Sequence, residues 1–286
     1  MGDLPRVTFI ARATYAVADL AKPRNRGSQT KRTEQLMVKI SFGFLLILIG
    51  AAVLCVSQTV IDGFIAKLYR DSNRQQMPYR LFIPKAYNKS QKYPLILWLH
   101  GAGGAGSDNV RQISGDQVPG TRIWLKPAVQ AKYAAFILVP QSEGVWSVGG
   151  EALSPPLAQV LAIINSLKHE FSIDSNRIYI TGQSNGGLGT WEFISKKPEV
   201  FAAAIALCSP PFSVNYAVRL ARMPIWVFNG ANDVASVLAL SQEMIAAIQK
   251  AGGAPRYTEY KGVGHEVWEH AFKEPELVDW LFAQHK

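Results

Sequence analysis

A serine between two glycines has the most specific chemical pattern in this sequence. Ser184 lies in Gly182-Gln183-Ser184-Asn185-Gly186, the only G-x-S-x-G pentapeptide of the chain, between a strand-like run at 177–180 and a helix-like stretch at 188–196. A strand, a tight glycine-flanked turn and a helix form a nucleophile elbow, which lifts the serine hydroxyl above a sheet. We therefore predict that Ser184 is a catalytic nucleophile; the alternative is a plain glycine-rich turn.

A serine hydroxyl is a poor nucleophile at neutral pH and needs a base, which a third group must orient. Of the five histidines, His265 lies in a glycine-flanked loop after the strand-like run 256–260, late in the chain. Asp233 is the single carboxylate in the loop after the apolar run 225–228. We predict His265 as the base and Asp233 as its orienting acid. The alternatives are a structural loop histidine and an ordinary turn aspartate.

The glycine-rich stretch 100–106 (HGAGGAG) follows another strand-like run, at 94–99. It contains a formal G-x-G-x-x-G, but a dinucleotide site would need a helix opening at the third glycine and an acid about 20 residues further on. Here a polar stretch follows, and the next strand ends in Pro140-Gln141. The pattern is better explained as an oxyanion loop. We expect the backbone N–H groups of Ala102 and Asn185 to bind the oxyanion of a tetrahedral intermediate.

Several residues follow strand ends or lie near the catalytic positions in sequence, and we predict that they contact substrate. They are His100, Gly101, Gln141, Trp146, Gln183, Trp191 and Trp268. Packing in the core or at the rim of a site explains such residues, the tryptophans above all, equally well.

The elements that must position these residues can be read from hydrophobic periodicity. Continuous apolar runs indicate strands buried on both faces, as in a parallel sheet; they span residues 94–99, 134–139, 177–180, 202–208 and 224–228. Helical spacing of apolar residues appears at 157–171 and 236–251. Residues 63–70 and 79–84 alternate with a period of two and predict an antiparallel entry hairpin. The sequence therefore predicts one α/β domain over residues 59–286, with a mostly parallel central sheet flanked by helices.

Composition excludes some classes of protein. The chain has 286 residues, 48% of them apolar, and a formal charge of +9. Residues 1–39 hold eight basic and three acidic residues, which leaves only +4 for the rest. No basic stripe interleaved with aromatics is present, so we expect no nucleic-acid partner. Cys55 and Cys208 lack the spacing of a metal site and give no disulfide framework. We expect no metal and no cofactor, and Cys208 is predicted to be a small core residue.

The first 58 residues are expected to direct the protein rather than to fold with it. Residues 40–61 carry no charge, and their most apolar part, 42–56, has the length of a signal-peptide core preceded by Lys39. We predict a leader at 1–36, outside the native protein or without fixed structure, with translation starting at Met37, and a signal peptide or membrane anchor at 37–58. The sequence leaves cleavage and anchoring by residues 40–61 as alternatives. Either predicts an exported protein, periplasmic or extracellular.

From residue 62 to residue 281 the chain resembles the bacterial secreted phospholipase/carboxylesterase-like hydrolases, often labelled polyhydroxybutyrate-depolymerase-like or feruloyl-esterase-like. The resemblance is carried by YRLFIPKAY, YPLILWLHGAGGAGSDN, DSNRIYITGQSNGGLGTW, PIWVFNGAND and AGGAPRYTEYKGVGHEVW. It implies the α/β-hydrolase fold, with Ser184 as nucleophile, Asp233 as acid and His265 as base. The elbow differs from its relatives at Gln183 and Asn185, and the acid loop differs after Asp233 and at Asn229. These departures leave the three catalytic positions intact but make family substrate names a poor guide.

We therefore expect a serine-dependent ester hydrolase acting through an acyl-enzyme on a small-molecule or polymeric ester. One alternative is a prolyl-oligopeptidase-like peptidase with the same three residues, although this chain has no room for the separate gating domain that such peptidases normally carry. Another is a non-catalytic exported binding protein on the same scaffold. Contact with a membrane is expected only through the N-terminal segment, if it is uncleaved. The sequence does not specify the acyl group, the alcohol or the oligomeric state.

Overall fold

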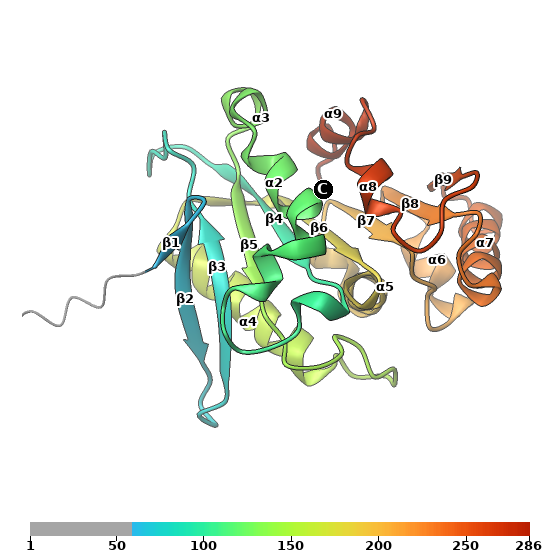
Figure 1. Cartoon of the computed structure of the whole chain (residues 1–286), viewed down its shortest axis with the longest axis horizontal. Coiled ribbons are helices and arrows are strands. Elements are labelled where there is room, and N and C mark those ends of the chain that lie inside the picture. Colours follow the sequence, from blue (N-terminus) through green and yellow to red (C-terminus); the bar gives the residue numbers. More distant parts are fainter. Residues whose placement is uncertain (1–58) are drawn as a thin grey trace, which may run out of the picture. The chain divides into compact units, whose positions relative to one another are not determined.

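The computed structural model describes residues 59–286, which contain a nine-stranded sheet (Figure 1). The strands are β1 (Val60–Ile61), β2 (Phe64–Arg70), β3 (Gln76–Phe82), β4 (Tyr93–Leu99), β5 (Phe136–Pro140), β6 (Ile173–Gln183), β7 (Ala203–Leu207), β8 (Ile225–Gly230) and β9 (Arg256–Tyr260). Their order across the sheet is β1-β2-β3-β5-β4-β6-β7-β8-β9. Pairing is antiparallel from β1 to β5 and parallel from β5 to β9.

Helices cover both faces of the sheet. They are α2 (Val118–Arg122), α3 (Pro127–Lys132), α4 (Pro155–Glu170), α5 (Asn185–Lys196), α6 (Ala217–Leu220), α7 (Ala235–Lys250), α8 (Trp268–Ala271) and α9 (Leu277–Phe282). Along β4, Leu95, Leu97 and Leu99 join the core beneath α4 to α7, whereas Ile96 and Trp98 join the core beneath α8 and α9. Because successive side chains point to opposite faces, a continuous apolar run supplies both cores.

The structure confirms the fold predicted from periodicity. The entry hairpin is β2 paired with β3, the two long predicted helices are α4 and α7, and each predicted apolar strand is present. Two strands are longer than the apolar runs indicate. β6 begins at Ile173, where Asp174-Ser175-Asn176 interrupts the apolar pattern, and β8 continues to Gly230 because Asn229 and Gly230 pair with β9.

The predicted leader and the signal or anchor, residues 1–36 and 37–58, lie outside the described residues, as does Cys55. The last two residues of the uncharged run 40–61 are Val60 and Ile61, which form strand β1 and therefore belong to the sheet. Among the helices of residues 59–286, none combines the length and the apolar character needed to cross a membrane. Cys208 is buried at the end of β7, as predicted for a small core residue.

Parallel strands β4 to β8 all point their carboxyl ends to one edge of the sheet, and the loops that leave this edge carry the predicted site. The glycine-rich stretch follows β4, Ser184 follows β6, and Asp233 follows β8. His265 follows β9, the last strand in the sheet order. In open α/β sheets, this edge is where ligands bind.

Candidate active site

Ser184 lies in a strained turn between β6 and α5. Its backbone has φ 53° and ψ −117°, a conformation that is costly for a residue other than glycine and that persists only where the surroundings impose it. A Cβ at Gly182 would strike the carbonyl of Gly186, and one at Gly186 would strike the carbonyl of Leu99. The two glycines therefore let α5 start directly against the ends of β4 and β6. This is the geometry of a nucleophile elbow.

The structure brings the three predicted catalytic side chains into one hydrogen-bonded row. The Ser184 Oγ lies 2.9 Å from Nε2 of His265, and Nδ1 of His265 lies 2.9 Å and 3.1 Å from the two carboxylate oxygens of Asp233. Since a carboxylate only accepts, Nδ1 carries the proton, and Nε2 is left to accept from the serine hydroxyl. The Asp233 side chain is 1% exposed and that of His265 is 44% exposed, so the acid is enclosed while the imidazole faces the open site.

The loops that carry the acid and the base are joined through their backbones. The N–H of Asn232 donates to the carbonyl of Val263 at 2.8 Å, and the N–H of Ala231 donates to that of Tyr260 at 3.0 Å. Gly230 allows this approach, because a Cβ there would strike the carbonyls of Val263 and Gly264. Asp233 and His265, 32 positions apart in sequence, are thereby brought into contact.

His100 holds the peptide that contains the first predicted oxyanion donor. Its Nε2 accepts from the N–H of Ser142 at 3.0 Å, so its Nδ1 carries the proton and donates to the carbonyl of Gly101 at 2.7 Å. That carbonyl belongs to the same planar peptide as the N–H of Ala102, so fixing one end orients the other. Burial lowers the pKa of His100 to about 4, although its bond to Gly101 and nearby Asp116 favour the charged form. His100 is therefore neutral at physiological pH.

Buried glutamines hold the rest of the glycine-rich loop. Oε1 of Gln117 accepts from the N–H of Gly101 at 2.9 Å, and Nε2 of Gln141 donates to the carbonyl of Gly104 at 3.2 Å. Within residues 59–286, the N–H groups of Ala102 and Asn185 donate no hydrogen bond. An oxyanion hole requires two free amides beside the serine hydroxyl, so the assignment of these two groups stays a prediction.

A buried ion pair on α5 holds the loop between β5 and α4. Oε1 of Glu192 accepts from Lys196 Nζ at 2.9 Å and from the N–H of Ser154 at 2.7 Å, while its Oε2 accepts from the hydroxyl of Ser147. Burial would raise the pKa of Glu192, but the hydrogen bonds from Ser147, Lys196 and Ser154 hold it below its usual value. The loop then reaches the glycine-rich stretch, because Nε1 of Trp146 donates to the carbonyl of His100 at 2.9 Å.

The predicted substrate contacts are placed differently from our expectation. The side chains of His100, Gln141, Trp146, Gln183, Trp191 and Trp268 are all less than 10% exposed, and Gly101 is buried as well. Most of them are hydrogen-bonded to protein atoms: Gln183 donates to Asp116, and Trp191 donates to the carbonyl of Ser209. Their placement favours packing behind the site over direct contact with substrate. Gln141 and Trp191 each line a cavity, and the two cavities are separate.

Sequence reasoning missed Gln117 and Glu192. The only signal for Glu192 is its i, i+4 spacing to Lys196 on the elbow helix, and this pattern is common on solvated helix faces. For Gln117 the sequence carries no signal, because the residue lies in a short 3₁₀ helix that approaches Gly101 only after folding.

Exposed apolar side chains occur in the loops that leave the carboxyl edge of the sheet. Val145 and Val148 in the loop after β5, Phe212 in the segment after β7 and Val234 beside Asp233 are each at least half exposed. No cluster of three or more His, Cys, Asp or Glu side chains in residues 59–286 could hold a metal ion. The groups gathered at Ser184 are a hydroxyl, an imidazole and a carboxylate.

The chain is similar in sequence to known hydrolases. A family model described as the prolyl oligopeptidase family matches residues 154–218, which include Ser184. Feruloyl esterase B of Neurospora crassa is 27% identical over 164 residues, covering 52% of this chain and 50% of that protein. A bifunctional acetylxylan esterase/xylanase of Neocallimastix patriciarum is 29% identical over 180 residues, covering 58% of this chain and 23% of that protein.

A crystal structure of a thermostable esterase superposes with a TM-score of 0.75 at 37% sequence identity, covering 79% of this chain and 64% of that one. The chain spans half or less of the length of the two curated relatives, the feruloyl esterase and the acetylxylan esterase/xylanase. Fold and sequence together define the class: the chain has the α/β-hydrolase fold and is similar to esterases that share it.

Proposed function

We propose that the protein is a carboxylic ester hydrolase that works through an acyl-enzyme on Ser184. The observation that carries the proposal is the row of hydrogen bonds from Ser184 through His265 to Asp233. The likeness to esterases supports an ester as the substrate class. A small or medium acyl or aryl ester suits the exposed apolar side chains in the loops of this sheet edge, among them Val145 and Val234.

The mechanism follows from the positions of the groups. The Ser184 Oγ attacks the ester carbonyl carbon while Nε2 of His265 takes the hydroxyl proton, and the Asp233 carboxylate stabilises the imidazolium that forms. The N–H groups of Ala102 and Asn185 bind the oxyanion. Collapse of the intermediate breaks the bond to the alcohol, which leaves with the proton from His265. Water, deprotonated by the same imidazole, then attacks the acyl-enzyme and releases the acid and free Ser184.

A peptidase is the second candidate, because the matched family model is that of the prolyl oligopeptidases. The match runs from α4 through β6, the elbow, α5 and β7 to the start of α6, and esterases and peptidases of this fold share these parts. An ester is the better proposal, because the more extensive sequence similarity is to esterases.

We also propose that the protein is exported, with residues 37–58 acting as a signal peptide or anchor. The support is the sequence pattern, in which a charged residue precedes a short apolar core and a polar stretch follows. Mass spectrometry of the native protein tests this: a start near residue 58 is expected for a cleaved signal and a start at Met37 for an anchor, and a peptide from residues 5–30 would contradict translation from Met37.

Substrate profiling tests the proposed activity. We expect hydrolysis of p-nitrophenyl esters of graded acyl length and of feruloyl esters, with the Ser184→Ala variant inactive on all of them. Faster hydrolysis of N-blocked prolyl peptides than of any ester would establish the peptidase instead. No hydrolysis of either by the folded wild type would favour a non-catalytic binding protein.

A further inference from the structure

Gln183, the residue before the predicted nucleophile, joins the elbow to the segment that supports the glycine-rich loop. Its Nε2 donates to the backbone carbonyl of Asp116 at 3.2 Å and to Oδ2 of the same residue at 3.3 Å. Asp116 lies in the short 3₁₀ helix Gly115–Gln117. Within residues 59–286, these are the only side-chain hydrogen bonds between the elbow, 182–186, and the segment 100–117. Gln183 is therefore the side-chain link between these two parts.

The same link packs against the glycines on either side of Ala102, the predicted oxyanion donor. A Cβ added at Gly101 would lie 3.3 Å from Cγ of Gln183, and one added at Gly103 would lie 2.7 Å from Oδ1 of Asp116. The second of these distances is an overlap, so glycine is needed where the loop meets the carboxylate. The loop therefore rests on the link both before and after Ala102.

The amide of Gln183 destabilises the fold. The residue is 0% exposed, and the carbonyl and carboxylate that its Nε2 meets only accept, so Oε1 must point elsewhere. Among residues 59–286, this Oε1 has no hydrogen-bond partner. A buried acceptor without a donor lowers the free energy of unfolding, and an apolar side chain of the same length would avoid that cost. Stability therefore does not explain the amide.

Gln117 shows the same imbalance on the other side of the link. Its Oε1 accepts from the N–H of Gly101 at 2.9 Å, while its Nε2 has no partner among the described residues, although Gln117 is also 0% exposed. Two fully buried glutamines thus each use one end of the amide at the loop and leave the other end unpaired. Local departures from the most stable choice of residue are expected at functional sites.

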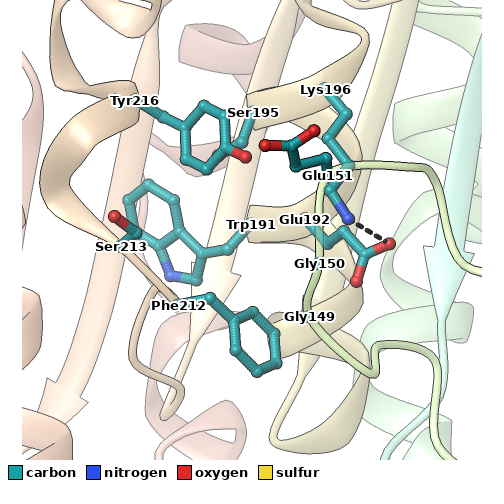
Figure 2. Close-up of a pocket in the computed structure, with 10 residues that line it drawn as sticks. All are labelled: Gly149, Gly150, Glu151, Trp191, Glu192, Ser195, Lys196, Phe212, Ser213 and Tyr216. Atoms are coloured by element: carbon teal, nitrogen blue, oxygen red, sulfur yellow. Dashed lines mark ion pairs between the residues drawn. The ribbon is translucent and has the colours of Figure 1, made fainter.

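The helix that begins at the elbow is anchored separately, from its later turns. Glu192 on α5 pairs with Lys196 Nζ at 2.9 Å, beside the cavity that Figure 2 draws, where a dashed line marks the pair. Glu192 also accepts from the N–H of Ser154 in the loop after β5. This support acts on the body of α5, whereas Gln183 acts at the residue next to the nucleophile.

We propose that Gln183 is a positioning residue that sets the place of the Ala102 N–H relative to the Ser184 Oγ, which rests on the proposed ester hydrolysis. In that reaction the substrate carbonyl must meet the hydroxyl and the amide at once. An error of about 1 Å in such geometry can cost roughly 10²-fold in rate. Gln183 acts through Asp116 and Gly101, and its amide contributes to rate rather than to stability.

Steady-state kinetics on p-nitrophenyl acetate, together with urea unfolding of the same full-length proteins, tests the proposal. Gln183→Met keeps the length of the side chain and its packing on Gly101 but removes the amide. We expect kcat to fall about 10- to 100-fold through the displaced donor. KM should change less than about 3-fold, because both tetrahedral intermediates use the same oxyanion donors. The urea midpoint should stay the same or rise, because the unpaired Oε1 is gone.

Asp116 supplies a second set of variants, because it is exposed and its replacement leaves the core intact. Asp116→Ala removes one of the two hydrogen bonds from Gln183 and should lower kcat about 5-fold. Asp116→Asn retains an accepting Oδ1 and should restore kcat to within about 2-fold of the wild type. The double variant Gln183→Met/Asp116→Ala should be no slower than Gln183→Met alone, because both changes break the same link.

Gln130→Met is the matched control. Gln130, in α3, bonds the backbone carbonyls of Trp124 and Ala135 before β5 begins, at the edge of the sheet opposite the site, and its loss should leave kcat unchanged. Wild-type kcat in Gln183→Met, or a lower urea midpoint together with a lower kcat, overturns the inference. Multiplying losses in the double variant overturn it as well.

The wild type separates the two possible failures. If it hydrolyses p-nitrophenyl acetate while the Gln183 and Asp116 variants match it, the positioning role fails and the proposed function stands. If the folded wild type hydrolyses no ester, the proposed function fails, and the positioning role falls with it.

Discussion

On one side of Ser184 the glycine-rich loop rests on buried side chains, whereas on the other side the base stands in a more exposed loop. His100, Gln117 and Gln141 each bond the backbone of the first loop from the core. His265, with a side chain that is 44% exposed, is oriented by one carboxylate. The side that must present fixed amides is thus heavily supported, and the side that must move protons depends on one partner.

The largest expected effect concerns the lightly supported side. Replacing Asp233 with Asn should lower kcat/KM for p-nitrophenyl acetate by about 10⁴-fold, because an amide that donates to Nδ1 favours the wrong tautomer of His265. Steady-state kinetics measures this, and the urea midpoint should change little. A loss below 10-fold in a folded variant would show that Asp233 does not orient the base.

On the heavily supported side, the buried ion pair is expected to contribute to stability. Lys196→Met should lower the free energy of unfolding by about 3–5 kcal/mol, because it leaves the Glu192 charge buried without its partner. The double variant Glu192→Gln/Lys196→Met removes both charges and should recover a large part of that loss. Urea unfolding of both variants measures it; equal stability of the single and double variants would refute a coupled pair.

His100 should make the folded state sensitive to acid. Its pKa is about 4 in the folded protein against an ordinary 6.5, so between these values the unfolded chain binds a proton that the folded chain does not. The contribution to stability is complete above about pH 6.5 and is lost as pH falls toward 4. For this single protonation, the difference in pKa corresponds to about 3 kcal/mol of unfolding free energy.

Urea unfolding at intervals from pH 7 to pH 4 measures this slope. A His100→Gln variant should be less stable at pH 7 but lose less stability across the same window. If wild type and variant show parallel pH dependence, His100 is not the group that couples folding to protonation.

The smallest effect is expected for the side chain of Asn185. The backbone N–H of this residue belongs to the predicted oxyanion hole, whereas its side chain only holds a neighbouring loop. Oδ1 of Asn185 accepts from the N–H of Trp146 at 3.2 Å. Asn185→Ala keeps the backbone donor and removes one hydrogen bond of about 1 kcal/mol, so kcat should fall less than 10-fold. A loss of 10³-fold would instead mean that the side chain itself contacts the reacting atoms.

The same contrast explains what could be predicted from sequence. Ser184, Asp233 and His265 each have a local signal, because a nucleophile and its partners must follow strand ends in glycine-marked turns. The strands were visible because burial on both faces requires continuous apolar runs. The supporting side chains have no such signal. The sequence predicts His100 and Trp146 as substrate contacts, and both are buried in the structure, because nearness in sequence to the site does not tell which way a side chain points.

The central claim is that Ser184 is an activated nucleophile, and reaction with a fluorophosphonate probe tests it most directly. We expect stoichiometric labelling of the wild type, with the modified peptide containing residue 184 identified by mass spectrometry, and no labelling of a folded Ser184→Ala variant. Labelling that persists in that variant, or a folded wild type that the probe leaves unmodified, would contradict the account.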